Sequence, residues 1–227
     1  MKTYSFLILL VKKTIHLMAG YALYGLGIVM TLNANQGLSP WDVFHQGLSN
    51  QIGITIGTAS QIVGAAVVIM DILFNERIGW GTILNVIFIG FFVDLFMLNG
   101  FVPKFNNIFA SYALMFAGMC VIALATFLYL SAQLGAGPRD GLMIALTKHL
   151  PLPVGLVRNL IELFILAAGY LMGGSVGFGT LFIALGMGRL IQVVFNLFKF
   201  DVRQVRHRYV DEDLSLIFNR LRNGKAG

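Results

Sequence analysis

Two aspartates, Asp42 and Asp140, are the first candidates for chemistry because each lies two positions after a proline in a glycine-containing motif. The motifs read GLSPWDV at 37–43 and GAGPRDG at 135–141. Proline is favoured at the first position of a helix, so each aspartate falls in a first helical turn, where free N–H groups favour a carboxylate. Helix capping alone accounts for this pattern. The functional alternative is that the two helix starts frame a polar site or a route for a proton or cation.

The residue before each aspartate differs between the motifs, with Trp41 in one and Arg139 in the other. A site built from both is therefore asymmetric, and an aromatic ring opposite a cation would suit an organic or anionic ligand. Tryptophan at a membrane interface and arginine on a cytoplasmic loop are the commoner structural explanations. The structural residues of the two motifs are Gly37, Pro40, Gly135 and Pro138.

Further charged side chains fall within long apolar segments, where an unpaired charge costs about 3 kcal/mol or more. They are Asp94, Glu162 and Arg189. We expect Arg189 to pair with Glu162 or Asp94, either as a structural ion pair or as part of a transport path. Arg158 precedes Glu162 by one turn, which favours an i,i+4 pair. Asp71 lies near the end of an apolar segment, so we expect it to reach the membrane interface.

The residue pattern contains no metal-ligand spacing and no paired nucleophile and base. His45, on the helix that begins at Pro40, has no second ligand at metal spacing. We therefore expect no metal site, no cofactor and no enzymatic activity.

The two motifs belong to a longer internal duplication. When the sequence is compared with itself at an offset of 98 positions, nine Gly, Pro, Asp and Thr positions match without a gap. Such self-similarity indicates two copies of one unit. We predict a first membrane repeat at 14–98 and a second at 108–198, preceded by an interfacial segment at 1–13 and followed by a cytoplasmic tail at 199–227.

Composition excludes a soluble domain. Apolar residues make up 57% of the 227 residues and charged residues only 11%, whereas soluble domains carry about 25% charged residues. The single cysteine, Cys120, rules out a disulfide framework. The net charge of +6 comes from basic residues beside apolar segments and in the tail, which favours membrane topology over a nucleic-acid partner.

Six apolar segments approach the ~20 residues needed to cross a bilayer. The segments that begin at Pro40 and Pro138 end near Asn50 and Leu150 and are too short to cross, so they are half-helices that either enter the protein interior or lie at the interface. The predicted fold class is all-α: a polytopic membrane helix bundle of six spans with two short half-helices. The predicted spans are 14–32, 58–74, 82–98, 108–130, 154–172 and 180–198.

The basic residues orient these spans. With both termini in the cytoplasm, Lys104 is the only basic residue in the outside loops, as the positive-inside rule requires. Three spans per copy then give the copies opposite orientations, an inverted 3+3 repeat of the kind found in many secondary transporters. A count of eight spans with parallel copies is weaker, because 40–50 would need nearly twice its length.

The motifs also resemble a known family. GLSPWDVFH at 37–45, GT at 57–58, GWGT at 79–82 and GAGPRDGLM at 135–143 closely resemble the YczE/YyaS/YitT family of bacterial integral membrane proteins. The resemblance covers about residues 12–198. It implies a multi-span helical fold in the bacterial inner (plasma) membrane, and it supplies no substrate and no catalytic residue.

The tail after the last span differs in character from the rest of the chain. Leu214, Ile217, Phe218 and Leu221 fall on one helical face, behind an acidic start at 211–213. We expect this amphipathic helix to lie on the cytoplasmic membrane surface or against the bundle.

Two functions fit these observations. The first is a small-solute transporter or permease with its site between the half-helix N-termini, in contact with the lipid bilayer and an unidentified small solute. The alternative is a non-transporting membrane scaffold or regulator that binds a partner protein through the C-terminal helix. No nucleic-acid partner is expected.

Overall fold

A computed structural model describes residues 2–201, 204–205, 207–213 and 215, with side chains from residue 11 onward. Over these residues the chain forms eight α-helices and no strand, which confirms the all-α prediction. The helices are α1 (Lys2–Ala34), α2 (Pro40–Ile52), α3 (Ile56–Leu73), α4 (Trp80–Leu98), α5 (Ile108–Ser131), α6 (Pro138–His149), α7 (Val154–Leu171) and α8 (Phe178–Leu197).

Six of the helices are long and apolar enough to cross a membrane, as predicted. They are α3, α4, α5, α7, α8 and the Val11–Ala34 part of α1. The half-helices α2 and α6 contain only 13 and 12 residues, too few to cross. Helix α1 runs unbroken from Lys2, so no break in the helix separates the predicted interfacial segment from the first span.

The two half-helices begin where the prolines require. Ser39 caps α2, since its hydroxyl oxygen accepts a hydrogen bond from the Asp42 backbone N–H at 3.3 Å. Gly137 precedes α6 without a side-chain cap. The chain reaches these starts through Gly37 and Gly135, whose φ angles of +116° and +138° suit glycine.

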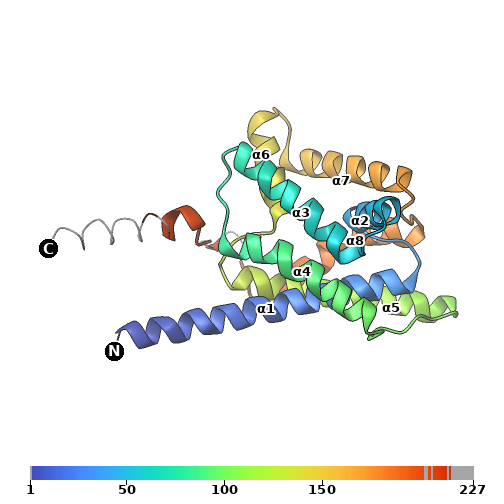
Figure 1. The fold of residues 1–227 in the computed structure, drawn as a ribbon, viewed down its shortest axis with the longest axis horizontal. Helices are drawn as coiled ribbons and strands as arrows, with labels where there is room; N and C mark the ends of the chain where they lie inside the picture. Colours follow the sequence, from blue (N-terminus) through green and yellow to red (C-terminus); the bar gives the residue numbers. More distant parts are fainter. Residues whose placement is uncertain (1, 202–203, 206, 214, 216–227) are drawn as a thin grey trace.

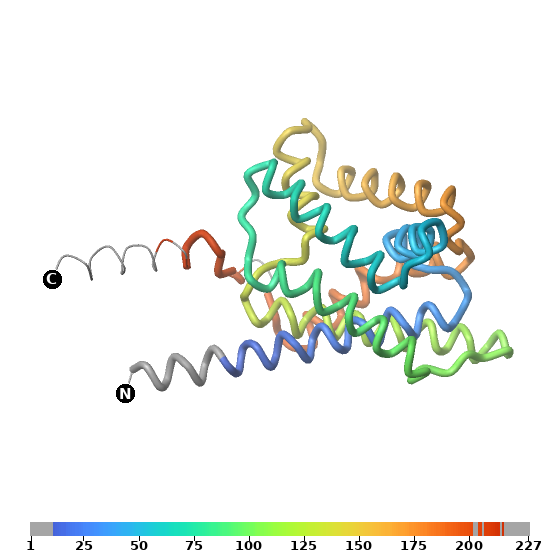
Figure 2. Tube along the Cα trace, viewed as in Figure 1, coloured from blue at the N-terminus to red at the C-terminus, as the bar shows by residue number. Residues whose placement is uncertain are grey.

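The loops gather at two opposite ends of the bundle (Figure 1). At one, the tail end, the C-terminal segment 207–213 bonds to two loops: Arg208 N–H donates to Gln133 O at 3.0 Å and Val210 N–H to Ile78 O at 2.9 Å. Figure 2 shows this segment leaving the bundle at the end from which α1 enters. At the far end, Asn33 Nδ2 in the last turn of α1 donates to Val102 O in the α4–α5 loop at 2.8 Å.

One backbone contact occurs twice, once at each end. At the tail end, Gly81 N–H donates to Leu134 O at 2.7 Å; at the far end, Gly179 N–H donates to Gln36 O at 2.8 Å. Both partners of the second bond lie 98 positions from those of the first. The loop that leads into each half-helix therefore rests on the Gly-x-Gly-Thr turn of the other sequence repeat.

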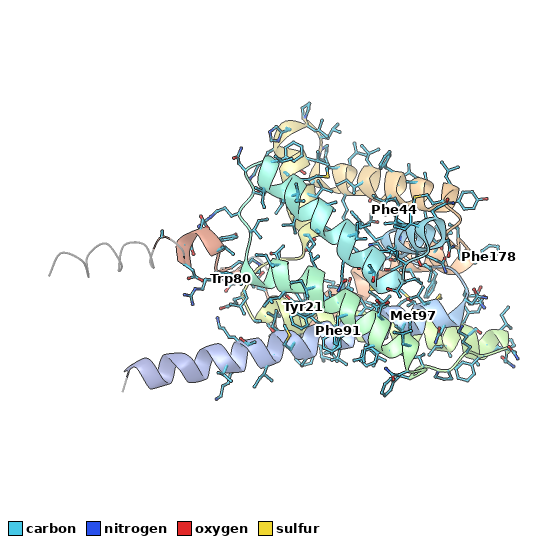
Figure 3. The ribbon with its side chains drawn as sticks, in the orientation of Figure 1. Tyr21, Phe44, Trp80, Phe91, Met97 and Phe178 are labelled. Carbon is cyan, nitrogen blue, oxygen red and sulfur yellow. The ribbon has the colours of Figure 1, made fainter. Side chains whose placement is uncertain are left out.

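The threonines of these turns reinforce the matched contact. Thr82 Oγ1 donates to Ala136 O at 2.7 Å, and the equivalent Thr180 Oγ1 accepts from Leu38 N–H at 3.1 Å. The predicted span 82–98 begins two residues late, because α4 begins at Trp80 and Gly79 is its N-cap. Figure 3 shows Trp80 at the tail end and its repeat equivalent Phe178 at the far end.

The half-helices also point to opposite ends. Gln51 at the end of α2 donates through Nε2 to Met172 O at 3.1 Å, in the α7–α8 turn. Lys148 near the end of α6 forms an ion pair of 2.6 Å with Glu76 in the α3–α4 turn. Thus α2 ends at the far end of the bundle and α6 at the tail end.

The repeats differ in how closely their last two helices pack. A methyl group added to Gly57 of α3 would lie 2.6 Å from Asp94 Oδ1 and closer still to Gly90 O of α4. The equivalent positions in α7 and α8 are Gly155 and Gly188, and no described atom lies within 4 Å of a methyl group added at either. Helices α3 and α4 are therefore in backbone contact where α7 and α8 stand apart.

Candidate functional site

The N-termini of the two half-helices meet through their first side chains. The guanidinium carbon of Arg139 lies 4.6 Å from the centre of the Trp41 ring, a cation–π contact. Trp41 is only 6% exposed. The two residues that break the symmetry of the motifs are therefore direct neighbours.

Two adjoining cavities of about 460 and 380 Å³ lie around this contact. These volumes fall in the range of small-molecule sites. The residues that line both cavities are Tyr24, Ile28, Trp41, Arg139, Arg158, Glu162 and Ile191. The larger cavity adds Asp140 and His45, and the smaller adds Asp42 and Arg189. Of the predicted site residues, all except Asp94 border this space.

Asp42 is held by its own helix start. It is 4% exposed, and its Oδ2 accepts a hydrogen bond of 2.5 Å from Ser39 Oγ. Its Oδ1 lies 3.6 Å from His45 Nδ1, beyond hydrogen-bond distance, and no described residue bonds to it. Burial lowers the pKa of His45, so the imidazole beside this carboxylate is neutral near pH 7.

Asp140 differs from its repeat equivalent in its electrostatics. Burial raises the pKa of Asp140, while the positive charges of Arg158 and Arg139 act in the opposite direction. A carboxyl group with a raised pKa that lines a cavity is suited to gain and lose a proton.

The pairing predicted for Arg189 was wrong. Glu162 forms an ion pair of 3.2 Å with Arg158 on its own helix, as its i,i+4 spacing predicted. Asp94 accepts hydrogen bonds from Thr55 Oγ1 at 2.5 Å and Gly57 N–H at 2.9 Å, so it caps α3 and lies outside both cavities. Arg189 is exposed and has no ion pair with a described residue.

The expectation for Asp71 was also wrong. Its side chain is fully buried, with 0% exposure, and so does not reach an interface. Sequence analysis also gave no site role to Arg158, which lines both cavities. A signal was present for Arg158, since it lies one turn from Glu162.

The C-terminal segment covers the tail end through its acidic residues. Arg77 pairs with Asp211 at 2.9 Å and with Glu212 at 2.8 Å, and Trp80 Nε1 donates to Asp213 at 3.0 Å. The four residues of the predicted apolar face lie outside the described residues. They are Leu214, Ile217, Phe218 and Leu221. In this structure, residues 211–213 attach the tail to the bundle.

We predict that His207 makes this attachment sensitive to pH. It lines the larger cavity, and burial lowers its pKa. The unfolded or undocked segment therefore binds a proton more readily, so docking is complete above the ordinary histidine pKa of about 6.5 and weakens as pH falls through it.

We expect Trp80 fluorescence in a Trp41→Phe background, which leaves one tryptophan, to shift on acidification. His207→Ala should remove the shift and His16→Ala should keep it; an unchanged response in His207→Ala would contradict this assignment.

Comparisons with known proteins agree with this architecture. Residues 11–196 match a family described as a family of unknown function, DUF6198. The chain belongs to this family. The matched range includes all six candidate spans except the last residue of α8, together with both half-helices.

Relatives of this chain occur in Bacillus subtilis and Haemophilus influenzae. The uncharacterised membrane protein YczE of Bacillus subtilis is 38% identical, covering 77% of this chain and 81% of its own length. An uncharacterised protein of Haemophilus influenzae is 32% identical, covering 80% and 82%. YyaS of Bacillus subtilis is 27% identical, covering 77% and 88%. The predicted resemblance to YczE and YyaS is thus confirmed, and the likeness to YitT stays a prediction.

No solved structure gave a significant match to this DUF6198 chain.

Proposed function

We propose that the protein is a small-solute transporter or permease of the bacterial inner membrane, with its site between the N-termini of α2 and α6. The observation that carries the proposal is the contact between Trp41 and Arg139, which line both cavities together with the charged side chains of Arg158 and Glu162. Two half-helices that begin at one site are typical of transporter sites near the bilayer midplane. We propose no enzymatic activity for the protein.

We also propose an inverted 3+3 repeat, which the same geometry supports. The matched bonds Gly81–Leu134 and Gly179–Gln36 lie at opposite ends of the bundle, as a two-fold axis in the membrane plane would require. If the positive-inside rule holds, the tail end is cytoplasmic and the far end, with Lys104, faces outward. This arrangement supports the proposal because inverted repeats allow one site to be reached from either side.

The difference between the repeats suggests how access alternates. At the α3–α4 pair, Gly57 and Gly90 bring the helices into backbone contact. At the α7–α8 pair, Gly155 and Gly188 are open, and the smaller cavity is lined there by Arg158 and Arg189. We infer a second state in which Gly155 packs on Gly188 while Gly57 and Gly90 separate. The structure then represents the state open through α7 and α8.

The cavity chemistry favours a solute that carries a negative group. Arg139, Arg158 and Arg189 line the smaller cavity against Asp42 and Glu162, and Glu162 already pairs with Arg158. Arginine binds carboxylate and phosphate groups through its planar fork. The Trp41 ring offers an apolar face beside it.

Transport by the purified protein in lipid vesicles tests the proposal. A panel of small organic acids and amino acids would be screened first by thermal stabilisation, and the compounds that stabilise the protein would then be measured for uptake. We expect Arg139→Gln to lower uptake at least tenfold, with Asp42→Asn and Asp140→Asn also impaired. Lys104→Gln is the control, because Lys104 is exposed in the α4–α5 loop and lies outside both cavities. Equal uptake by Arg139→Gln and wild type would exclude the proposed site.

The alternative, a scaffold that binds a partner through its tail, is less well supported. Residues 209–213 are engaged with Arg77, Ile78 and Trp80 of the same chain. Co-purification of a partner that is lost when residues after Phe200 are deleted, with insertion unchanged, would favour it.

A further inference from the structure

A buried carboxyl group lies where the second half-helix crosses the first repeat. Asp71 of α3 is 0% exposed, and neither of its carboxylate oxygens has a hydrogen-bond partner among the described residues. It packs on the first turn of α6, where a methyl group added to Gly141 would lie 2.9 Å from Asp71 Cγ. The carboxyl group therefore lies directly against the half-helix backbone.

The equivalent crossing in the other half carries no such group. There α2 crosses α7 at Gly169, the repeat equivalent of Asp71, and a methyl group on Gly169 would lie 2.5 Å from Phe44 N. A glycine is therefore sufficient for close packing of α2 on α7. Asp71 is thus not required for the crossing geometry itself, which points to another role for its carboxyl group.

Among the described residues, no positively charged side chain pairs with Asp71. The charges that act on it most strongly are those of Glu76 and Asp140, both negative. On α6, Lys148 pairs with Glu76 and Arg139 lies on Trp41, while His149 contacts Phe74. The remaining charged or titratable groups on packed helices are Asp42 and His45 of α2, which lie together, and Asp94 of α4, which caps the opposite end of α3.

These surroundings determine the protonation state. An ionised carboxylate without partners inside a membrane protein is strongly disfavoured, and such a group takes up a proton instead. We propose that Asp71 is a proton-binding site whose occupancy controls how α6 seats on α3. Neutral Asp71 lets Gly141 pack against it, whereas the ionised carboxylate requires water and so separates α6 from α3.

The proton bound at Asp71 would be the coupling ion of the transporter, an inference that rests on the proposed function. Helix α6 carries Arg139 and Asp140 into the cavity, so a change in its seating moves the solute site. A proton from the aqueous phase adds to one carboxylate oxygen of Asp71 in one state and returns to water in the other. The coupled solute would then move with a proton.

Infrared spectroscopy of the full-length protein in lipid vesicles tests the proton site without a solute. At neutral pH we expect the C=O stretching band of a protonated carboxyl group, which should disappear as pH rises. The band should be absent in Asp71→Asn, an isostere of the protonated acid, and retained in the control Asp94→Asn, because Asp94 caps the opposite end of α3. A band that survives in Asp71→Asn but is lost in Asp140→Asn would place the proton on Asp140 and overturn the assignment, as would the absence of any band in the wild type.

The coupling step has a separate readout. Spin labels at Gly155→Cys and Gly188→Cys, in a Cys120→Ser background, report the α7–α8 separation by double electron–electron resonance in frozen samples. We expect the distance distribution to change with pH and to become independent of pH in Asp71→Asn. Suppose that the carboxyl band disappears in Asp71→Asn but the wild-type distance distribution does not depend on pH. This result would support Asp71 as the proton site and would contradict its coupling to the α7–α8 separation. Failure of solute uptake alone would count against the transporter, since neither readout needs a solute.

Discussion

Replacing Gly57 or Gly90 by alanine is expected to lower the free energy of unfolding by about 1–3 kcal/mol, the usual range for overpacking. The same replacement at Gly155 or Gly188 should leave it unchanged or raise it by up to about 1 kcal/mol, since alanine favours the helix and meets no neighbour. The reason is that a methyl group at Gly90 would lie 2.5 Å from Gln61 Cγ, whereas none of the described atoms lies within 4 Å of one at Gly188.

Thermal unfolding in detergent, followed by size-exclusion chromatography, measures this difference. The four variants form two matched pairs, because Gly155 and Gly188 stand 98 positions after Gly57 and Gly90. Equal destabilisation of both pairs would show that α7 and α8 are as closely packed as α3 and α4, and would remove the basis for a second state.

The same positions separate stability from the transport cycle. A Cβ at Gly155 or Gly188 meets no described atom within 4 Å, so we expect leucine there to be accommodated in this state but to block closure of α7 on α8. We therefore expect folding to be retained and transport to be lost. A disulfide between Gly155→Cys and Gly188→Cys in membranes would capture the closed state directly.

The repeat was the most predictable part of the fold. Glycine, proline and threonine at eight of the nine matched positions mark places where the backbone turns or approaches another backbone, and such places tolerate few other residues. The contacts of Gly81 with Leu134 and of Gly179 with Gln36 explain why the Gly-x-Gly-Thr turns match. Span lengths were predictable because bilayer thickness determines them.

The charge pairs were less predictable. Which charges meet depends on which helices are neighbours, and a sequence does not give that directly. Glu162 takes the local partner, Arg158, one turn away, which leaves Arg189 facing the cavity. Asp94 is used at the start of α3, where Thr55 and the Gly57 N–H need an acceptor.

The burial of Asp71 and the docking of the tail could not be read from hydropathy. Asp71 lies near the end of its helix, where a polar residue usually reaches water, but α6 covers it. Residues 210–213 are helical, as the acidic start predicts, but the pairing of Asp211 and Glu212 with Arg77 depends on the α3–α4 turn being adjacent. Both features depend on long-range contacts that the local pattern does not contain.

The central claim is that the two half-helices approach one site from opposite faces of the membrane. Ile52 at the end of α2 and its equivalent Leu150, directly after α6, are 56% and 41% exposed. Each would be replaced by cysteine in a Cys120→Ser background and treated with a membrane-impermeant maleimide in intact cells and after permeabilisation. We predict that Ile52→Cys reacts in intact cells and that Leu150→Cys reacts only after permeabilisation. Labelling of both from the same side would contradict the inverted arrangement and, with it, the proposed transport site.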